Sequence, residues 1–369
     1  MKLKRKRSMK VLSLLLVLVL LLGAFSACGG NGGSSDNGDG TGDGTTTREL
    51  SLSLMWGPNH ELNTKIIPLW NEYLAEATNG EVQIVNYPGG TLTSSTEAYE
   101  GVVQGISDMA IVGYGLTRGR FPVVETFILP GIDWYSSMSV GKAFDEGMRI
   151  IQPKEHEDAH FLFGFSPGPG EIISQVPVRN LDDLQGLDIL VNSGTRADAM
   201  ELLGANPIMM PTPEFYEALQ RGVAKAALVS GETLEGYRLF EVTGDYITAA
   251  PFLFSFAFGA IINHDVWESL SPAAQEALST PPDGVYELFN NLNVVGYQLN
   301  ASNKEVEIIY LPEEEQEIWK EKIQPVIDAH LADLESRGID SETVFETVLE
   351  LSEKWNNEFS EPLPYLMDY

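Results

Sequence analysis

Two histidines stand four residues apart with a glutamate directly after the first, in His156-Glu157-Asp158-Ala159-His160. On a helix this spacing puts both imidazoles on one face, where they can hold zinc while the glutamate activates a bound water. The surroundings do not favour such a helix, because Pro153 precedes the motif and Phe161-Leu162-Phe163 begins a strand at once. We therefore expect a polar corner between a helix and a strand. A zinc hydrolase using His156, Glu157 and His160 is kept as an alternative.

A second motif, Gly164-Phe165-Ser166-Pro167-Gly168, has the spacing of a nucleophile elbow. An elbow needs the backbone N–H after the serine for its oxyanion hole, and Pro167 has none. The Pro-Gly run also prevents the helix that should follow. We expect this segment to be a strand that ends in a hinge-like loop, and we assign no residue to catalysis.

Polar residues follow three short apolar runs between Leu181 and Val229. The runs are 187–191, 207–210 and 226–229, and helical spacing lies between them, with Thr195 as a possible helix cap. This β-α-β-α-β order predicts a mostly parallel sheet. Ligands bind beyond the carboxyl ends of such strands. Those ends are Asn192-Ser193-Gly194, Pro211-Thr212-Pro213 and Ser230-Gly231-Glu232.

A similar unit opens the chain. Leu50, Leu52 and Leu54 alternate in a first strand, an amphipathic helix covers 62–77, and strands are predicted at 82–87 and 109–112 around a helix at 97–104. Trp56 and Tyr114 each directly follow a strand of this unit, which makes them the better aromatic candidates. Pro251-Phe252-Leu253-Phe254 is more typical of a core. Helices are expected near 285–303, at 313–337 and at 341–359.

The candidate binding residues are thus mainly polar or aromatic side chains at strand ends. They are Trp56, Asn59, His60, Ser94, Ser95, Tyr114, Asn192, Ser193, Pro211, Glu214, Ser230, Glu232 and Tyr237. A family resemblance adds Gly170, Glu171, Leu190 and Arg196 to this set.

The chain opens with a targeting segment. Six basic residues lie in positions 1–10, and an almost wholly apolar stretch from Val11 to Leu22 is too short to span a bilayer. Small residues then precede Cys28, the only cysteine in the chain. This pattern resembles a bacterial lipoprotein signal, with cleavage before Cys28 and lipid on its sulfur. Residues 28–48, rich in Gly, Ser, Asp and Thr, are expected to be a flexible linker.

Charge excludes one class of partner. The 369 residues carry 23 basic and 53 acidic side chains, and removal of residues 1–27 leaves 17 basic side chains and a net charge of −36. Nucleic acid is not an expected partner, because the basic surface that binds phosphates is absent. Without Cys28 no thiol remains. No motif indicates a metal or another cofactor.

Three segments in order resemble the substrate-binding proteins of TRAP transporters, the DctP family, over about residues 49–335. The first runs from Gly80 through Tyr87-Pro88 to Asp108-Met109-Ala110. The second runs from Leu181-Asp182-Asp183-Leu184 through Leu203-Gly204-Ala205-Asn206-Pro207, Glu214 and Tyr216-Glu217-Ala218-Leu219 to Gly222-Val223. The third runs from Asn263 through Trp267 to Pro272 and Gln275.

One departure bears on the ligand. The family arginine that pairs with a substrate carboxylate falls on Leu190. Arg196, one turn into the next helix, could replace it, although an arginine there is more typical of a solvated surface. Otherwise the ligand is not gripped as a simple carboxylate, and Glu171, Glu214 and Glu232 would favour a polar or cationic ligand if they face the cleft.

The resemblance implies an α/β, two-domain periplasmic-binding-protein-like fold, with a hinge and a long helix that spans both domains near 285–303. We expect domain I at 49–167 plus about 256–295, and domain II at 168–255 plus about 296–369 with the C-terminal helices. It also implies an extracytoplasmic, lipid-anchored protein that passes a small-molecule solute to TRAP membrane permease subunits. A ligand sensor for a signalling receptor is the other alternative.

Overall fold

The computed structural model describes residues 47–359. The expected signal segment, Cys28 and nearly all of the 28–48 linker lie outside this range. Within the described range, no helix is both long and apolar enough to cross a membrane.

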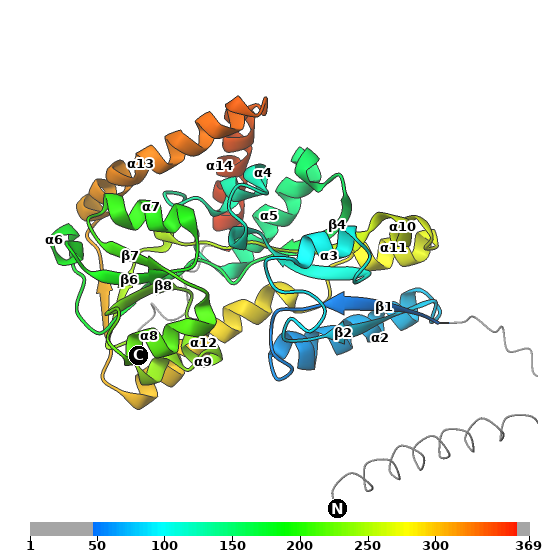
Figure 1. Ribbon diagram of the computed structural model, residues 1–369, viewed down its shortest axis with the longest axis horizontal. Helices are drawn as coiled ribbons and strands as arrows, with labels where there is room; N and C mark the ends of the chain where they lie inside the picture. Colours follow the sequence, from blue (N-terminus) through cyan, green and yellow to red (C-terminus); the bar gives the residue numbers. More distant parts are fainter. Residues whose placement is uncertain (1–46, 360–369) are drawn as a thin grey trace, which may run out of the picture. The chain divides into compact units, whose positions relative to one another are not determined.

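The first sheet has five strands in the order β2-β1-β3-β10-β4 (Figure 1). The predicted alternation is present, because Leu50 and Leu52 on β1 are fully buried. β1 pairs in parallel with β2 and β3, and β10 lies antiparallel between β3 and β4. The strand bounds are β1 Arg48–Ser53, β2 Val82–Tyr87, β3 Met109–Gly113, β4 Ala159–Phe165 and β10 Phe258–Asn263.

The second sheet has six strands in the order β11-β9-β5-β8-β6-β7. β6 pairs in parallel with both β7 and β8, which confirms the predicted β-α-β-α-β unit. β5 is antiparallel to its neighbours β8 and β9. The strand bounds are β5 Glu171–Ser174, β6 Asp188–Val191, β7 Asn206–Met209, β8 Ala226–Val229, β9 Tyr246–Ala249 and β11 Glu307–Tyr310.

The chain crosses between the sheets more than once. It leaves the first sheet after β4 and enters the second at β5, then returns from β9 to β10. β10 and β5 are the strands that run antiparallel in their respective sheets. The crossover from β9 to β10, residues 250–257, therefore lies next to both sheets.

Helices cover the sheets and connect their strands. The α-helices are α2 Ile67–Ala77, α3 Ala98–Val103, α4 Pro122–Glu125, α5 Ser137–Ile151, α6 Leu181–Leu184, α7 Gly194–Leu202, α8 Phe215–Gln220, α9 Glu232–Gly236, α10 His264–Glu268, α11 Pro272–Ser279, α12 Val285–Asn303, α13 Glu313–Ser336 and α14 Ser341–Glu358. A π-helical turn, η1 Leu62–Ile66, precedes α2. Short 3-10 turns are η2 Tyr114–Leu116, η3 Thr126–Ile128, η4 Lys154–His156, η5 Thr212–Glu214, η6 Leu239–Glu241 and η7 Pro251–Leu253.

Helix α12 is the long helix that links the two parts of the fold. It has the expected bounds and packs against η1 and α5, which belong with the first sheet, and against α9 and η6, which follow strands of the second (Figure 1). The α/β, two-domain architecture with a spanning helix is confirmed. The C-terminal helices do not all lie with the second sheet as expected, because α14 packs along α5.

Candidate functional site

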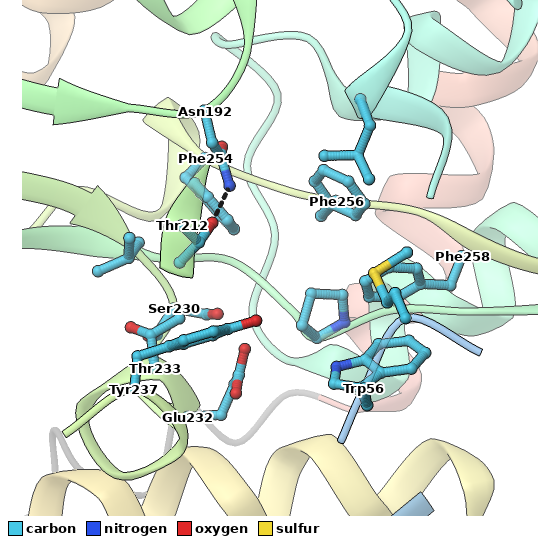
Figure 2. A pocket seen from close by; sticks show the side chains of 14 residues that line it. Trp56, Asn192, Thr212, Ser230, Glu232, Thr233, Tyr237, Phe254, Phe256 and Phe258 are labelled. Carbon is cyan, nitrogen blue, oxygen red and sulfur yellow. Dashed lines mark hydrogen bonds between the residues drawn. The ribbon is translucent and has the colours of Figure 1, made fainter. Parts of the chain in front are cut away.

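A cavity lies where the carboxyl ends of strands from both sheets meet the crossover. The empty space within it, open solvent included, is about 490 Å³. Figure 2 shows the side chains that line it. They are Met55, Trp56, Leu116, Pro167, Asn192, Thr212, Val229, Ser230, Glu232, Thr233, Tyr237, Phe254, Phe256 and Phe258.

The polar side of the cavity comes from the second sheet. Asn192, Thr212 and Ser230 follow β6, β7 and β8, so the parallel register brings their positions to one edge. The Asn192 amide donates a hydrogen bond of 2.9 Å to the Thr212 hydroxyl. The Thr233 hydroxyl donates to the Ser230 carbonyl at 2.6 Å. The side-chain carbonyl oxygen of Asn192 accepts a hydrogen bond from the Arg196 guanidinium.

Glu232 begins the short helix α9 and lines the cavity. Its backbone N–H donates to Asn293 of α12 at 2.8 Å, which fixes the start of the helix. Within residues 47–359 the structure gives its carboxylate no hydrogen bond or ion pair. Burial, together with the smaller effect of the neighbouring charge of Glu235, raises the pKa of Glu232 to about 7. Glu232 is therefore a carboxyl group available to a ligand.

Tyr237, at the end of α9, contributes a hydroxyl to the same wall. Burial raises the pKa of Tyr237 well above its usual value, and the charge of Glu232 adds to this effect. The tyrosine therefore stays neutral at physiological pH and can donate or accept a hydrogen bond.

Aromatic rings form the opposite side. The rings of Trp56 and Phe258 meet edge to face with centroids 4.7 Å apart, and Phe256 and Phe258 lie 4.9 Å apart. Trp56 comes from the loop after β1, whereas Phe254 and Phe256 come from the crossover. Trp56, Phe256 and Phe258 thus lie on one side of the cavity, and the polar groups of the second sheet lie on the other, together with Phe254 and Tyr237 (Figure 2).

A wider hollow adjoins this cavity and shares Met55, Trp56, Glu232 and Tyr237 with it. The hollow is also lined by Asn59, His60, Glu61 and Glu235. Burial lowers the pKa of His60 to about 4, so this histidine is neutral at pH 7. Its ring stacks on Trp56 at 5.4 Å.

Arg196 is not the solvated surface residue that its position favoured, because it is 1% exposed. Its guanidinium donates to the Asn192 side chain and to the Ser255 carbonyl, and lies 4.0 Å from the centre of the Phe254 ring. Burial lowers the pKa of Arg196 to about 9, so it remains charged at pH 7. It supports Asn192 and Phe254 from behind and is not among the residues that line the cavity.

Leu190 does not reach the cavity either. It is fully buried in an apolar cluster that includes Phe215 and Ile247. The position of the family arginine therefore contributes packing in this chain, and no charge.

Seven of the predicted residues lie at the site. Trp56, Asn192, Ser230, Glu232 and Tyr237 line the cavity, and Asn59 and His60 line the adjoining hollow. The other ten do not line either space: Ser94, Ser95, Tyr114, Gly170, Glu171, Leu190, Ser193, Arg196, Pro211 and Glu214.

Tyr114 was expected at the cavity and is instead fully buried in the core. Side chains alternate along β3, so Tyr114 follows Ala110 and Val112 onto one face while Met109 and Ile111 occupy the other. Its ring packs against Phe121 and Phe144 with centroids 5.0 and 5.5 Å away. Asn192 and Tyr114 thus do not share a cavity.

The remaining displaced residues have local roles. Glu171 accepts a hydrogen bond from the Tyr297 hydroxyl of α12, and Gly170 is packed against the backbone of Val229. Ser193, and not Thr195, occupies the cap position of α7. Ser94 donates to Glu97 at the start of α3, and Pro211 and Glu214 are exposed.

The His156 to His160 segment does not form a zinc site. His156 ends the 3-10 turn η4 and His160 lies on β4, so the two rings are not on one helix face. His156 is packed between Tyr99 and Tyr114, and burial lowers its pKa to about 3. His160 stacks on Trp267 at 3.8 Å. The polar corner is confirmed and the zinc hydrolase is wrong.

Ser166 is likewise structural. Its hydroxyl donates to the Phe256 carbonyl at 2.6 Å and accepts from the Gly168 backbone at 2.8 Å. Because the side chain is fully buried, it ties the end of β4 to the crossover and presents no nucleophile.

Comparison with known proteins decides the family. The family model of bacterial extracellular solute-binding proteins, family 7 (DctP), matches residues 52–333. This chain belongs to that family. Its members are binding proteins and not enzymes, in agreement with the expectation that no residue is catalytic.

Solved structures share the fold. A TRAP periplasmic solute binding protein from Desulfovibrio salexigens is 29% identical with a TM-score of 0.75, covering 84% of this chain and 97% of that one. It is an open complex with the C-terminus of a symmetry mate in its ligand binding site. A second, from Bordetella bronchiseptica with bound (R)- and (S)-mandelate, is 25% identical with a TM-score of 0.74, covering 83% and 99%.

A curated relative, the 2,3-diketo-L-gulonate-binding periplasmic protein of Escherichia coli, is 28% identical over 213 residues. The match covers 57% of this chain and 64% of the relative. Across three of the curated relatives that it matches, the chain spans 56% to 64% of their length.

Nine residues that line the cavity were missed. Four of them, Met55, Thr212, Val229 and Thr233, directly adjoin a predicted site residue and could have been found by extending each strand end. Phe254, Phe256 and Phe258 alternate along the crossover, which is the signal that was available. Phe252 and Leu253 belong to the core as expected, whereas Phe254 also faces the cavity.

Proposed function

We propose that this protein is the extracytoplasmic solute-binding lipoprotein of a TRAP-type secondary transporter. It captures a small polar organic molecule in the cavity between the two sheets and delivers it to the membrane permease subunits. The observation that carries the proposal is the cavity itself, in which Trp56 from the first sheet faces Asn192 and Ser230 from the second.

Capture takes place by hinge bending of two lobes. The lobes are residues 49–167 with about 256–295 and helix α14, and residues 168–255 with about 296–340. Because both lobes contribute to the cavity wall, a ligand that contacts both favours the closed arrangement.

The membrane attachment is a lipid on Cys28, followed by the 28–48 linker. Each buried CH₂ of an acyl chain contributes about 0.8 kcal/mol to membrane binding. Replacing Cys28 with Ala releases the protein from the membrane fraction of its cell, and a Cys28→Ala variant that stays there contradicts the anchor.

The ligand is not held as a simple carboxylate. Leu190 stands where the family arginine is expected, and Arg196 donates to Asn192 and Ser255 behind the cavity wall. The remaining polar groups suit a ligand that carries hydroxyl or N–H groups.

Thermal unfolding in the presence of a broad compound panel tests this function. A ligand at about 100 times its Kd stabilises the folded state by about 2.7 kcal/mol. We expect at least one polar compound to stabilise the protein, and Thr212→Trp, which fills the cavity from its rim, to abolish the effect. Ser94→Trp, on an exposed turn away from the cavity, is the control. Equal stabilisation of the wild type and Thr212→Trp places binding elsewhere and contradicts the proposal.

A further inference from the structure

The ionisable side chains that line the cavity and the adjoining hollow are all acidic or neutral. Among the described residues, the two linings contain Glu61, Glu232 and Glu235 and no lysine or arginine. His60 adds no positive charge, because burial lowers its pKa to about 4. Lys65 lies 2.7 Å from Glu61 on the outer rim, so one of these carboxylates already has a partner.

Glu232 is the acidic group placed to contact a ligand. Figure 2 shows its carboxylate in the space between the rings of Tyr237 and Trp56. Its main chain is fixed by Asn293, and no cation among the described residues pairs with its side chain. Glu232 is half-buried, so its carboxylate is partly removed from water without a partner, and a cation at this place would offset that cost.

The aromatic wall suits the same kind of ligand. Tyr237 lies beside Glu232, and Trp56 and Phe258 line the opposite side of the cavity, with Phe256 of the crossover next to Phe258. Aromatic ring faces are electron-rich and attract cations, and cages of this composition recognise amines and quaternary ammonium groups. Apolar walls alone would also accept an uncharged aromatic ligand. Glu232 is therefore the feature that favours a cation over a neutral ligand.

An anionic ligand would be repelled at this place. Its carboxylate would lie near Glu232, and like charges repel strongly where water is excluded. Arg196, a cation behind the wall, already donates to Asn192 and Ser255 and lies against Phe254.

We propose that the cavity selects an organic cation, whose amine or quaternary ammonium nitrogen lies against Glu232 between Trp56 and Tyr237. This inference rests on the proposed function, because it names the ligand class of the same cavity.

Isothermal titration at pH 8 with matched ligands tests it. Each set keeps one carbon frame, benzyl, cyclohexylmethyl or butyl, and carries an amine, a trimethylammonium, a hydroxyl or a carboxylate. In the frame that binds best, we expect the cations to bind at least about tenfold more tightly than the alcohol, and the carboxylate to bind most weakly.

The matched variants are Glu232→Gln and Glu214→Gln. Glu232→Gln keeps the shape of the side chain and removes its charge, so the cations lose about tenfold or more in affinity while the alcohol is unchanged. Glu214 is exposed and does not line the cavity, so Glu214→Gln leaves every affinity unchanged. Equal losses for cation and alcohol in Glu232→Gln would mean a structural role only and overturn the inference.

Two further outcomes separate this inference from the proposed function. A carboxylate that binds more tightly than its amine, and loses that affinity in Arg196→Met, overturns the organic cation and leaves the solute-binding function standing. A complete lack of binding in all frames, together with no stabilisation in the broad thermal panel, overturns both.

Discussion

A single carboxyl group determines the chemistry of the cavity. Glu232 differs from the exposed glutamates of this acidic chain in being surrounded by Tyr237, Tyr297 and the start of its own helix. Because burial raises the pKa of Glu232 to about 7, the group is half protonated in the free protein at neutral pH. A bound cation favours the ionised form, so binding and proton release are linked.

Binding of a cation should therefore depend on pH. The folded pKa of about 7 lies above the usual value of 4.5, so the ionised form that binds a cation becomes dominant as pH rises through 7. We expect the affinity for benzyltrimethylammonium to increase by about tenfold between pH 6 and pH 8. Titration calorimetry in buffers of different ionisation enthalpy measures both the affinity and the protons released.

The other ionisable groups near Glu232 must be considered in this pH dependence. Glu235 lies on the same helix, Tyr237 at its end, and Tyr297 on α12, and His60 and Glu61 line the adjoining hollow. His60, with its pKa lowered to about 4, does not change charge in this window. Glu232→Gln should remove the pH dependence, and the same slope in wild type and variant would assign it to another group.

The sequence placed some residues of the site and not others. Asn192, Ser230 and Glu232 were found because each directly follows a strand of one parallel unit, and parallel strands share a carboxyl edge. Tyr114 also follows a strand, but the alternation along β3 sends its side chain to the core face. The position of a residue at a strand end determines which edge of the sheet it lies on. The alternation of side chains along the strand then determines whether its side chain faces the cavity or the core.

At the scale of elements, the contact between α9 and α12 positions Glu232. A Cβ on Gly296 of α12 would lie 2.1 Å from the carbonyl oxygen of Gly231, and a Cβ on Gly231 would lie 2.2 Å from the ring of Tyr297. The two glycines allow the helix carrying Glu232 to approach α12 closely. Asn293, one turn earlier on α12, then reaches the Glu232 backbone.

Gly296→Ala should disturb this contact. Alanine favours a helix over glycine by about 1 kcal/mol, but forcing a methyl group into packed backbone costs about 1–3 kcal/mol and displaces α9. We expect a net loss of unfolding free energy in denaturant titrations, together with weaker cation binding. Val295→Ala, at an exposed position of the same helix, is the control. A Gly296→Ala protein as stable as the wild type would show that the close approach is not required.

The elements themselves were largely predictable. Periodicity and caps predicted the β-α-β-α-β units and the helices α2, α3, α13 and α14 to within a few residues, whereas α5 was not predicted and the family resemblance placed the long helix near the bounds of α12. The return of the chain to the first sheet at β10 was expected only from the family resemblance, which assigned about 256–295 to domain I, since no local pattern specifies which sheet a short apolar run joins. The packing of α14 along α5 depends on contacts distant in sequence, and periodicity does not encode it.

For the whole molecule, the arrangement of the two sheets explains why binding and closure belong together. The rings from the first sheet and the crossover cover only part of a ligand. The polar groups from the second sheet cover another part. The crossover at 250–257 and the helix α12 connect the two parts and are the elements that must accommodate a hinge motion. A ligand between the sheets completes the contacts of both, and this favours the closed state.

The central claim is that an organic cation binds at this place. A crystal structure of the wild-type protein with benzyltrimethylammonium tests it most directly. We predict that the nitrogen lies within about 6 Å of the centre of the Trp56 ring, as cation–π contacts require, and faces the Glu232 carboxylate. A ligand found outside the cavity, or bound in it with its nitrogen turned away from Glu232, would contradict the account.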